Sequence, residues 1–273
     1  MSFDYTKYLR TEHLPHLWCP GCTHGIVMKS FLRVVDSLGL NQDETVVVSG
    51  IGCASRLPGY VDFCTLHTTH GRALPFATGI KLARPELTVV VVSGDGDALA
   101  IGGNHFIHAC RRNIDLTLII FNNSVYGMTG GQYSPTTDHG MFSSTTPYGN
   151  PDHAFDAGAL AMAAGATFVA RTTAYHVRQM DKLIGQAVQH SGFSVVEVLE
   201  ACYTNFGRRN KQLFKSNMDM LMDLKKKAVP VEKARKLAPK EMEGKYETGL
   251  LYEVGRPGYI ECCDDMIGRK QEG

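Results

Sequence analysis

Two short polar segments could together bind a metal ion. Gly94-Asp95-Gly96-Asp97 and Asn122-Asn123 each follow an apolar, β-branched run. A carboxylate and a carboxamide are hard oxygen ligands, and Mg²⁺ takes few protein oxygens, leaving other positions for water and phosphate. With a backbone carbonyl from the next turn, Asp95 and Asn123 would form half of an octahedron that a diphosphate completes. Glycines at 94, 96, 127, 130 and 131 would let the backbone approach phosphate closely.

The cysteines point to a second metal centre. Cys19-Pro-Gly-Cys22 is a CxxC pair, which alone is compatible with a zinc knuckle, a redox motif or one corner of an iron–sulfur cluster. Structural zinc sites usually bring a second such pair, but this chain offers only single cysteines, Cys53 and Cys202, after strand-like runs. Four thiolates from dispersed loops can hold a [4Fe–4S] cluster. The remaining cysteines are expected to be free thiols: Cys64, Cys110, Cys262 and Cys263.

These residues require a scaffold that gathers loop ends on one side. Apolar runs predict five buried strands: Thr45–Ser49, Leu87–Ser93, Leu116–Phe121, Thr167–Ala170 and Ser194–Leu199. Helical patterns lie between them: Arg72–Ala83, Gly102–Arg111, His153–Ala164 and Tyr175–His190. This alternation predicts an α/β fold with a doubly wound, mostly parallel sheet. Ligands bind such sheets beyond the carboxyl ends of the strands, where the unusual residues fall.

The amino-acid composition of the chain changes after Tyr203. We expect residues 1–215 to form the main domain and residues 216–273 to form an appended, lysine-rich C-terminal arm with a helix over Met218–Leu224. The 273 residues are 44% hydrophobic with a net charge of +1, so no global field attracts nucleic acid or an anionic membrane. The first twenty residues lack an apolar run, and no run is long enough to span a bilayer. A soluble cytoplasmic protein is expected.

Five motifs in order resemble a known family. Trp18-Cys-Pro-Gly-Cys22, Ser49-Gly-Ile-Gly-Cys53, His70-Gly-Arg-Ala73, Gly94-Asp-Gly-Asp97 and Asn122-Asn-Ser-Val-Tyr-Gly-Met-Thr-Gly-Gly-Gln132 look like the β subunit of 2-oxoacid:ferredoxin oxidoreductases. The resemblance extends from about residue 15 to residue 205. Other thiamine-diphosphate enzymes share Gly-Asp-Gly and Asn-Asn but lack the four cysteines. The expected fold is therefore the diphosphate-type thiamine-binding domain.

The resemblance implies cofactors and their ligands. Cys19, Cys22, Cys53 and Cys202 correspond to the ligands of one [4Fe–4S] cluster, while Asp95, Asn123 and the carbonyl of Val125 correspond to those of Mg²⁺. The residues expected to contact thiamine diphosphate are Ile51, Gly52, Cys53, His70, Gly94, Asp95, Gly96, Asp97, Asn123, Val125, Gly127, Met128 and Thr129.

The resemblance also implies a reaction and partners. A 2-oxoacid loses CO₂, single electrons pass through the cluster to ferredoxin, and coenzyme A takes the acyl group. A separate α subunit supplies the glutamate that hydrogen-bonds the aminopyrimidine ring, so the active site should lie at a subunit interface. Two copies of each subunit are expected.

Two polar residues are further candidates for catalysis. His70, in a polar loop before a helix, is assigned to cofactor or substrate contact. Arg56 follows Cys53 by three residues, where a guanidinium could bind a second carboxylate in bidentate fashion. A basic residue at this place resembles family members that use 2-oxoglutarate, so succinyl-coenzyme A is the expected product. The same chemistry run in reverse would fix CO₂.

Several alternatives stay open. Pyruvate or branched 2-oxoacids are the alternative substrates, and Arg56 could instead balance thiolate charge. Gly50-x-Gly52 partly resembles a dinucleotide-binding fingerprint, but the third glycine is missing. A thiamine-dependent decarboxylase or synthase would leave the cysteines without a role. A non-catalytic protein that binds zinc or a cluster is the alternative outside the enzymes.

Overall fold

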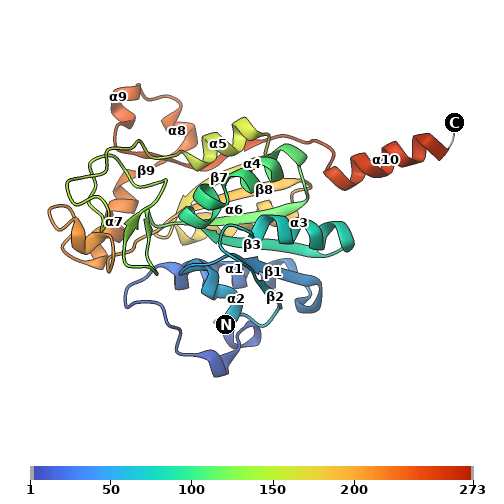
Figure 1. The fold of residues 1–273 in the computed structure, drawn as a ribbon, viewed down its shortest axis with the longest axis horizontal. Coiled ribbons are helices and arrows are strands. Elements are labelled where there is room, and N and C mark those ends of the chain that lie inside the picture. Colours follow the sequence, from blue (N-terminus) through green and yellow to red (C-terminus); the bar gives the residue numbers. More distant parts are fainter. Residues whose placement is uncertain (1–2, 272–273) are drawn as a thin grey trace.

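The computed structural model describes residues 3–271, and a mostly parallel sheet of eight strands forms its centre (Figure 1). Six parallel strands come first in spatial order: β2 (Cys64–His67), β1 (Thr45–Ser49), β3 (Thr88–Gly94), β4 (Leu116–Asn122), β8 (Phe193–Leu199) and β7 (Phe168–Thr173). β10 (Tyr246–Glu253) runs antiparallel to β7, and β9 (Ala228–Pro230) pairs with β10 at the edge. A separate hairpin contains β5 (Val125–Tyr126) and β6 (Gln132–Tyr133).

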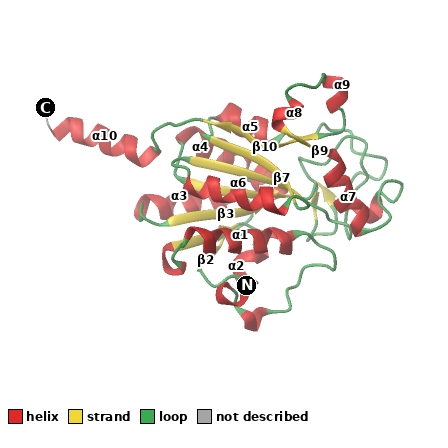
Figure 2. Cartoon of the chain, turned by 180° about the vertical axis from the view of Figure 1, so that it is seen from behind, coloured by secondary structure: helices red, strands yellow, loops and turns green. Residues whose placement is uncertain are grey.

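Helices cover both faces of this sheet, which gives three layers (Figure 2). One face carries α1 (His24–Leu38), α2 (Leu57–Tyr60) and α6 (Val177–Gln189). The other carries α3 (Ala73–Ala83), α4 (Gly103–Arg112) and α5 (Ala157–Ala164). The later helices are α7 (Asn217–Lys227), α8 (Val231–Ala234), α9 (Pro239–Met242) and α10 (Tyr259–Gln271). A π-helical turn, η5 (Asp97–Ile101), precedes α4, and short 3₁₀ turns are η1 (Tyr5–Tyr8), η2 (Thr11–His13), η3 (Gln42–Glu44), η4 (Ala54–Arg56) and η6 (Gly207–Arg209).

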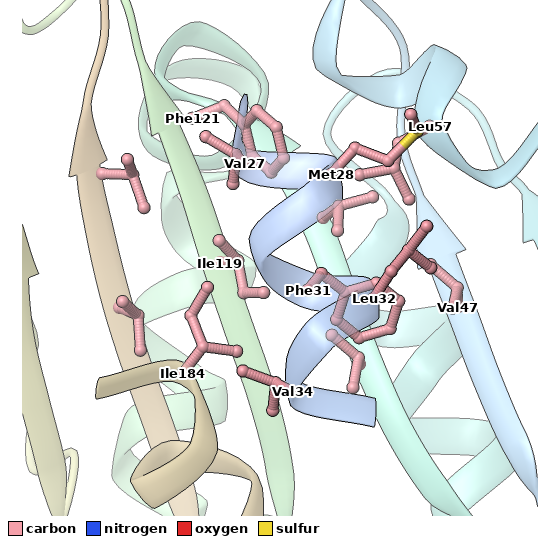
Figure 3. Packing of buried hydrophobic residues seen from close by; sticks show 14 of the residues in the cluster. Val27, Met28, Phe31, Leu32, Val34, Val47, Leu57, Ile119, Phe121 and Ile184 are labelled. Carbon is pink, nitrogen blue, oxygen red and sulfur yellow. The ribbon is translucent and has the colours of Figure 1, made fainter. Parts of the chain in front are cut away.

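Helix α1 illustrates how sequence spacing builds the core. Val27, Phe31 and Leu32 recur at helical spacing and are fully buried against the sheet. In Figure 3 these side chains point toward Val47 and Ile119 on the strands. The helix ends at Gly39, whose φ of 62° is a left-handed conformation that glycine adopts without steric cost.

The five predicted strands are all present, with ends shifted by at most a few residues. Helix α5 begins at Ala157 rather than His153, because the Asp156 side chain caps it by accepting a hydrogen bond from the Ala159 amide at 2.9 Å. The sequence analysis assigned no element to α1 or β2. The short strand β2 is mostly exposed at the sheet edge, so it lacks the apolar run that marked the others.

Within the described residues, the segment after Lys215 contributes a strand to the main sheet. Strand β10 pairs with β7, and Val231 and Leu251 are buried in the same apolar cluster as α3–α5. Helix α10 extends away from the body (Figure 1). Among the residues described, no helix has the length and apolar character needed to cross a membrane.

Candidate active site

A cavity of about 190 Å³ lies at the carboxyl ends of β1, β3 and β4. Its lining includes every residue that the sequence analysis assigned to cofactor contact: Ile51, Gly52, Cys53, His70, Gly94, Asp95, Gly96, Asp97, Asn123, Val125, Gly127, Met128 and Thr129. His24, Ala54, Phe121 and Tyr126 complete the lining. The parallel register brings these dispersed loops to one edge of the sheet. We call this space the cofactor cavity.

Asp95 is a buried carboxylate that forms no ion pair with any residue described by the structure. Ser134 and Thr136 donate hydrogen bonds from their hydroxyls to its Oδ2, at 2.5 and 2.6 Å. Burial raises the pKa of Asp95 to about 6, and within residues 3–271 no cationic side chain offsets that burial. A desolvated carboxylate is stabilised by a bound cation. Together with the carboxamide of Asn123, which lines the same cavity, this donor set suits Mg²⁺.

Close packing requires glycine at one position beside these ligands. A Cβ on Gly96 would lie 2.2 Å from the Tyr126 ring. Gly131 has a φ of +92° and closes the β5–β6 turn by donating its N–H to the Tyr126 carbonyl at 2.9 Å. The hairpin can therefore approach the cavity more closely than a chain with side chains at these positions.

Asp97 holds the loops around the cavity together. Its Oδ1 accepts hydrogen bonds from the Gly71 amide at 2.7 Å, the Ile51 amide at 3.2 Å and His70 Nδ1 at 2.6 Å. Its Oδ2 accepts from the Ser93 hydroxyl at 2.5 Å. Both carboxylate oxygens are thus committed to the protein, and the bond to Nδ1 fixes the orientation of the His70 ring beside the cavity.

The four predicted cluster cysteines line a second cavity of about 210 Å³, which we call the cysteine cavity. Its walls carry Cys19, Cys22, Cys53 and Cys202 together with Arg56. Burial raises the pKa of Cys53, and it raises the pKa of Cys202 to about 12. Cys19 and Cys22 add to both upward pKa shifts, and Cys53 adds to that of Cys202, as expected for thiols that line one cavity.

Four thiols around one space are the donor set of a [4Fe–4S] cluster. Across residues 3–271, no three His, Cys, Asp or Glu side chains converge as closely as ligands of a single metal ion do. Cys110 is fully buried elsewhere, on α4, and Cys64 is exposed on β2. Neither residue lines the cysteine cavity, and Cys262 and Cys263 do not line it either.

A buried His24–Glu200 pair was missed by the sequence analysis. His24 Nδ1 hydrogen-bonds to Glu200 Oε2, and the His24 side chain lines both cavities. Burial alone would lower the pKa of His24, but Glu200 and the Cys22 side chain outweigh it and raise the pKa well above its usual value. Sequence position was the available signal, because His24 lies two residues after Cys22 and Glu200 lies two residues before Cys202.

A second missed set supports Asp95 from behind. The Arg171 guanidinium on β7 donates a hydrogen bond to Glu197 on β8 at 2.6 Å. Glu197 accepts another hydrogen bond from the side-chain amide of Asn122 at 2.7 Å. Thr136 Oγ1, which donates its proton to Asp95, also lies 2.8 Å from Asn122 Oδ1. A continuous polar network therefore connects the two strands to the candidate Mg²⁺ ligand.

Comparisons with known proteins identify the family and the relatives of this chain. Residues 50–198 match the family described as "Thiamine pyrophosphate enzyme, C-terminal TPP binding domain". The chain is 63% identical over 205 residues to the 2-oxoglutarate synthase subunit KorB of Archaeoglobus fulgidus, covering 75% of this chain and 76% of that protein. It is 49% identical over 268 residues to the corresponding subunit of Methanothermobacter marburgensis, covering 98% and 92%.

A solved structure extends the likeness to the fold. The 2-oxoglutarate:ferredoxin oxidoreductase of Magnetococcus marinus, with 2-oxoglutarate, coenzyme A and succinyl-CoA bound, matches with a TM-score of 0.87 and 34% identity. The match covers 99% of this chain and 91% of that one. The predicted fold class and family are thereby confirmed. This chain belongs to the family of thiamine-pyrophosphate-binding β subunits of 2-oxoacid:ferredoxin oxidoreductases, which includes the 2-oxoglutarate synthase subunits.

Proposed function

We propose that this chain is the β subunit of an enzyme that oxidatively decarboxylates 2-oxoglutarate to succinyl-coenzyme A and CO₂, passing electrons through a [4Fe–4S] cluster to ferredoxin. One observation carries the proposal. The cofactor cavity and the cysteine cavity share a wall, formed by His24, Cys53, Asn123, Gly127 and Met128. A cofactor in one cavity and a cluster in the other would be near neighbours, as electron transfer requires.

Different residues of the cofactor cavity would bind the metal ion and the diphosphate. Asp95, Asn123 and the carbonyl of Val125 would hold Mg²⁺, and the glycine-bearing turns at 94–96 and 127–129 would contact the diphosphate. Asp97 would keep His70 against the substrate side of the cavity. When bound, thiamine diphosphate supplies the carbanion chemistry that releases CO₂ from a 2-oxoacid.

The cysteine cavity would hold the cluster through Cys19, Cys22, Cys53 and Cys202. Trp18 covers this site: its indole N–H donates to the Cys53 carbonyl at 2.7 Å, and the ring is buried. A cluster covered on one side by protein is protected from solvent, which influences its potential.

Arg56 is proposed to select a dicarboxylic substrate. It lies on the wall of the cysteine cavity, and Cys53 links that wall to the cofactor cavity. A guanidinium pairs with carboxylate strongly and with defined geometry. The names of the relatives from A. fulgidus and M. marburgensis support 2-oxoglutarate as the substrate. Pyruvate, with one carboxylate, would leave this cation unpaired.

A second subunit is proposed to complete the active site. Ile51 and Met128 line the cofactor cavity, yet 39% and 42% of their surfaces are exposed, so its mouth is apolar and uncovered in the single chain. An α subunit carrying the aminopyrimidine glutamate would cover it. Ferredoxin and coenzyme A are the further partners, in a cytoplasmic enzyme of two copies of each subunit.

Steady-state kinetics of the reconstituted αβ enzyme test this function. We expect a kcat/KM for 2-oxoglutarate at least tenfold above that for pyruvate, and no turnover by the β chain alone. Arg56→Ala should lower kcat/KM for 2-oxoglutarate about 10- to 100-fold, corresponding to loss of a charge-assisted hydrogen bond of about 1.5–3 kcal/mol. Arg56→Lys keeps the charge but not the bidentate geometry. Its kcat/KM for 2-oxoglutarate should therefore lie between those of the wild type and Arg56→Ala.

Three outcomes would contradict parts of the proposal. A wild-type preference for pyruvate would reject the substrate, and turnover by the chain alone would reject the requirement for an α subunit. If Arg56→Ala keeps its preference for 2-oxoglutarate but loses iron, the arginine balances thiolate charge instead of binding substrate.

A further inference from the structure

The surface next to the cysteine cavity is strongly basic. Between Tyr203 and Met218 the chain carries four cationic side chains and no acidic one, although the net charge of the whole chain is only +1. All four are exposed, and none forms an ion pair with a residue in the part of the chain that the structure describes. We call these side chains the basic patch: Arg208, Arg209, Lys211 and Lys215.

Backbone contacts fix one end of the patch to a candidate cluster ligand. The amides of Phe206 and Gly207 donate to the Cys202 carbonyl at 3.1 and 3.0 Å, so the turn η6 folds directly onto that residue. The Arg208 guanidinium lies over the Tyr203 ring, 5.9 Å from its centroid, and Tyr203 lines the cysteine cavity. The first cation of the patch is therefore separated from the cavity by a single side chain.

The other end of the patch reaches the CxxC loop. The Tyr203 hydroxyl donates to the Lys215 carbonyl at 2.7 Å, and the Asn217 side-chain amide donates to the Pro20 carbonyl at 3.1 Å. In Figure 1 this segment is the orange loop that leads into α7. Because Cys19 is exposed and lines the cysteine cavity, the cavity opens to solvent beside the patch.

Apolar side chains accompany the cations. Leu213, within the patch, is 55% exposed, and Met218 and Leu17 are 61% and 74% exposed. Asp219, the first acidic residue after the patch, accepts the Lys215 amide at 2.8 Å, so its carboxylate is directed at the backbone. Exposed apolar groups among uncompensated cations are the composition of a surface that binds an acidic protein.

We propose that the basic patch is the docking surface for an acidic iron–sulfur electron carrier, the ferredoxin of the proposed function, with Leu213 as its apolar contact. The inference rests on that function, because it takes the cysteine cavity as the site from which electrons leave. In each encounter the reduced cluster loses one electron and the oxidised carrier gains it, with no proton or group transferred. Opposite charges speed the encounter and orient the carrier, and salt weakens this attraction.

Binding of a purified acidic ferredoxin to the reconstituted αβ holoenzyme tests the proposal by biolayer interferometry. Arg208→Gln with Lys211→Gln should raise Kd about tenfold at about 50 mM salt and by less than about twofold at about 500 mM, where charges are screened. Lys236→Gln with Lys240→Gln is the matched control, because it removes two exposed charges near α8 and α9 and should leave Kd unchanged. Leu213→Ser should raise Kd at both salt concentrations, since an apolar contact is not screened.

Steady-state kinetics give a second readout. With 2-oxoglutarate and methyl viologen, a small cationic acceptor, the Arg208→Gln, Lys211→Gln variant should keep the wild-type kcat, whereas its KM for ferredoxin should rise about tenfold. Its iron and sulfide contents should equal those of the wild type. Lys211→Glu, a single change at an exposed position, repeats the test with the least disturbance of the turn and should weaken ferredoxin binding in the same direction.

Four outcomes would overturn the docking surface. They are an unchanged Kd in both patch variants, an equal loss of binding in the control variant, a loss of iron on removing the patch charges, and a patch variant that no longer assembles with the α subunit. The last two would show that the cations balance the cluster or contact that subunit instead. A wild-type enzyme without a cluster, or one that does not reduce ferredoxin, would instead reject the proposed function itself.

Discussion

At the scale of single residues, two aspartates of one motif have opposite environments. Asp95 is buried with its charge uncompensated by any cation among the described residues, whereas Asp97 is surrounded by hydrogen-bond donors. The two side chains are two positions apart on a segment that changes from strand to π-helical turn. The Gly-Asp-Gly-Asp motif therefore combines a residue suited to bind a cation with one suited to hold loops.

This difference predicts opposite effects on the stability of the cofactor-free chain. Asp97→Asn should lower the free energy of unfolding by about 1–3 kcal/mol, because its amide cannot accept from every donor that the carboxylate satisfies. Asp95→Asn should not lower it, because a desolvated charge is removed. Only Asp95→Asn should abolish the thermal stabilisation produced by Mg²⁺ and thiamine diphosphate. Differential scanning fluorimetry with and without ligands measures both effects, and equal losses in the two variants would contradict the assignment.

The cysteines also divide by location, into four that line the cysteine cavity and four that do not. Single Cys→Ser variants at 19, 22, 53 and 202 should each lose most of their iron and sulfide, because each removes one of four thiolate ligands. Cys110→Ser is the matched control, since Cys110 is fully buried but lies on α4, outside the lining of the cysteine cavity. Chemical iron and sulfide analysis of purified variants gives the result. Normal iron in Cys202→Ser would remove that residue from the ligand set.

At the scale of elements, one ion pair connects neighbouring strands beneath the site. Arg171 on β7 lies directly opposite Glu197 on β8 in the parallel register. Arg171 also bonds to Asp156, the residue that caps α5, so a helix and two strands meet at one guanidinium. Glu197 and Asp156 together raise the pKa of Arg171 despite its burial. The charge is therefore retained inside the fold.

Removing one partner should destabilise the protein more than removing both. Glu197→Ala should lower the free energy of unfolding by about 3–5 kcal/mol, because the Arg171 cation is left buried without its main partner. Replacing both residues, Arg171→Met with Glu197→Leu, should recover most of that loss. Urea denaturation followed by circular dichroism provides the comparison. A double variant as unstable as Glu197→Ala would show that the pair is not the cause.

At the scale of the whole molecule, the C-terminal segment completes the sheet on one side. Strand β10 covers the edge of β7, and Leu251 on β10 is buried against the helices of the second face. The Arg235 guanidinium donates to the Leu251 carbonyl at 3.1 Å, which attaches the chain after α8 to the same strand. Beyond Tyr259, whose amide donates to the Asn113 carbonyl at 3.1 Å, α10 leaves the body.

Two truncations separate these roles. Ending the chain at Lys215 should produce an aggregating protein, because it uncovers the β7 edge and the apolar surface under Val231 and Leu251. Ending it at Cys263 keeps Ile260 on the core and removes only the outer part of α10, where Met266 is 68% exposed. That protein should remain monodisperse, with a melting temperature within about 2 °C of the full chain, since an exposed segment contributes little to stability. Size-exclusion chromatography and thermal melts decide both cases.

The sequence by itself determined five buried strands and the ligand candidates. A strand buried on both faces must be apolar almost throughout, as in β1 and β4, so its run is visible without any partner. Because parallel strands deliver their carboxyl ends to one edge, Asp95, Asn123 and Cys53 could be placed together in advance. Local chemistry and the period of the pattern were sufficient for these assignments.

Only the tertiary structure decided how the ligands are supported. The His24–Glu200 pair spans 176 positions, and the Ser134 and Thr136 hydroxyls reach Asp95 from 39 and 41 positions away. The paired residues Gly249 on β10 and Arg171 on β7 are 78 positions apart in sequence. No local period or motif encodes such contacts, because they depend on which loops the folded sheet brings together. The sequence alone therefore identifies the groups that can bind, and the fold determines which polar side chains orient them.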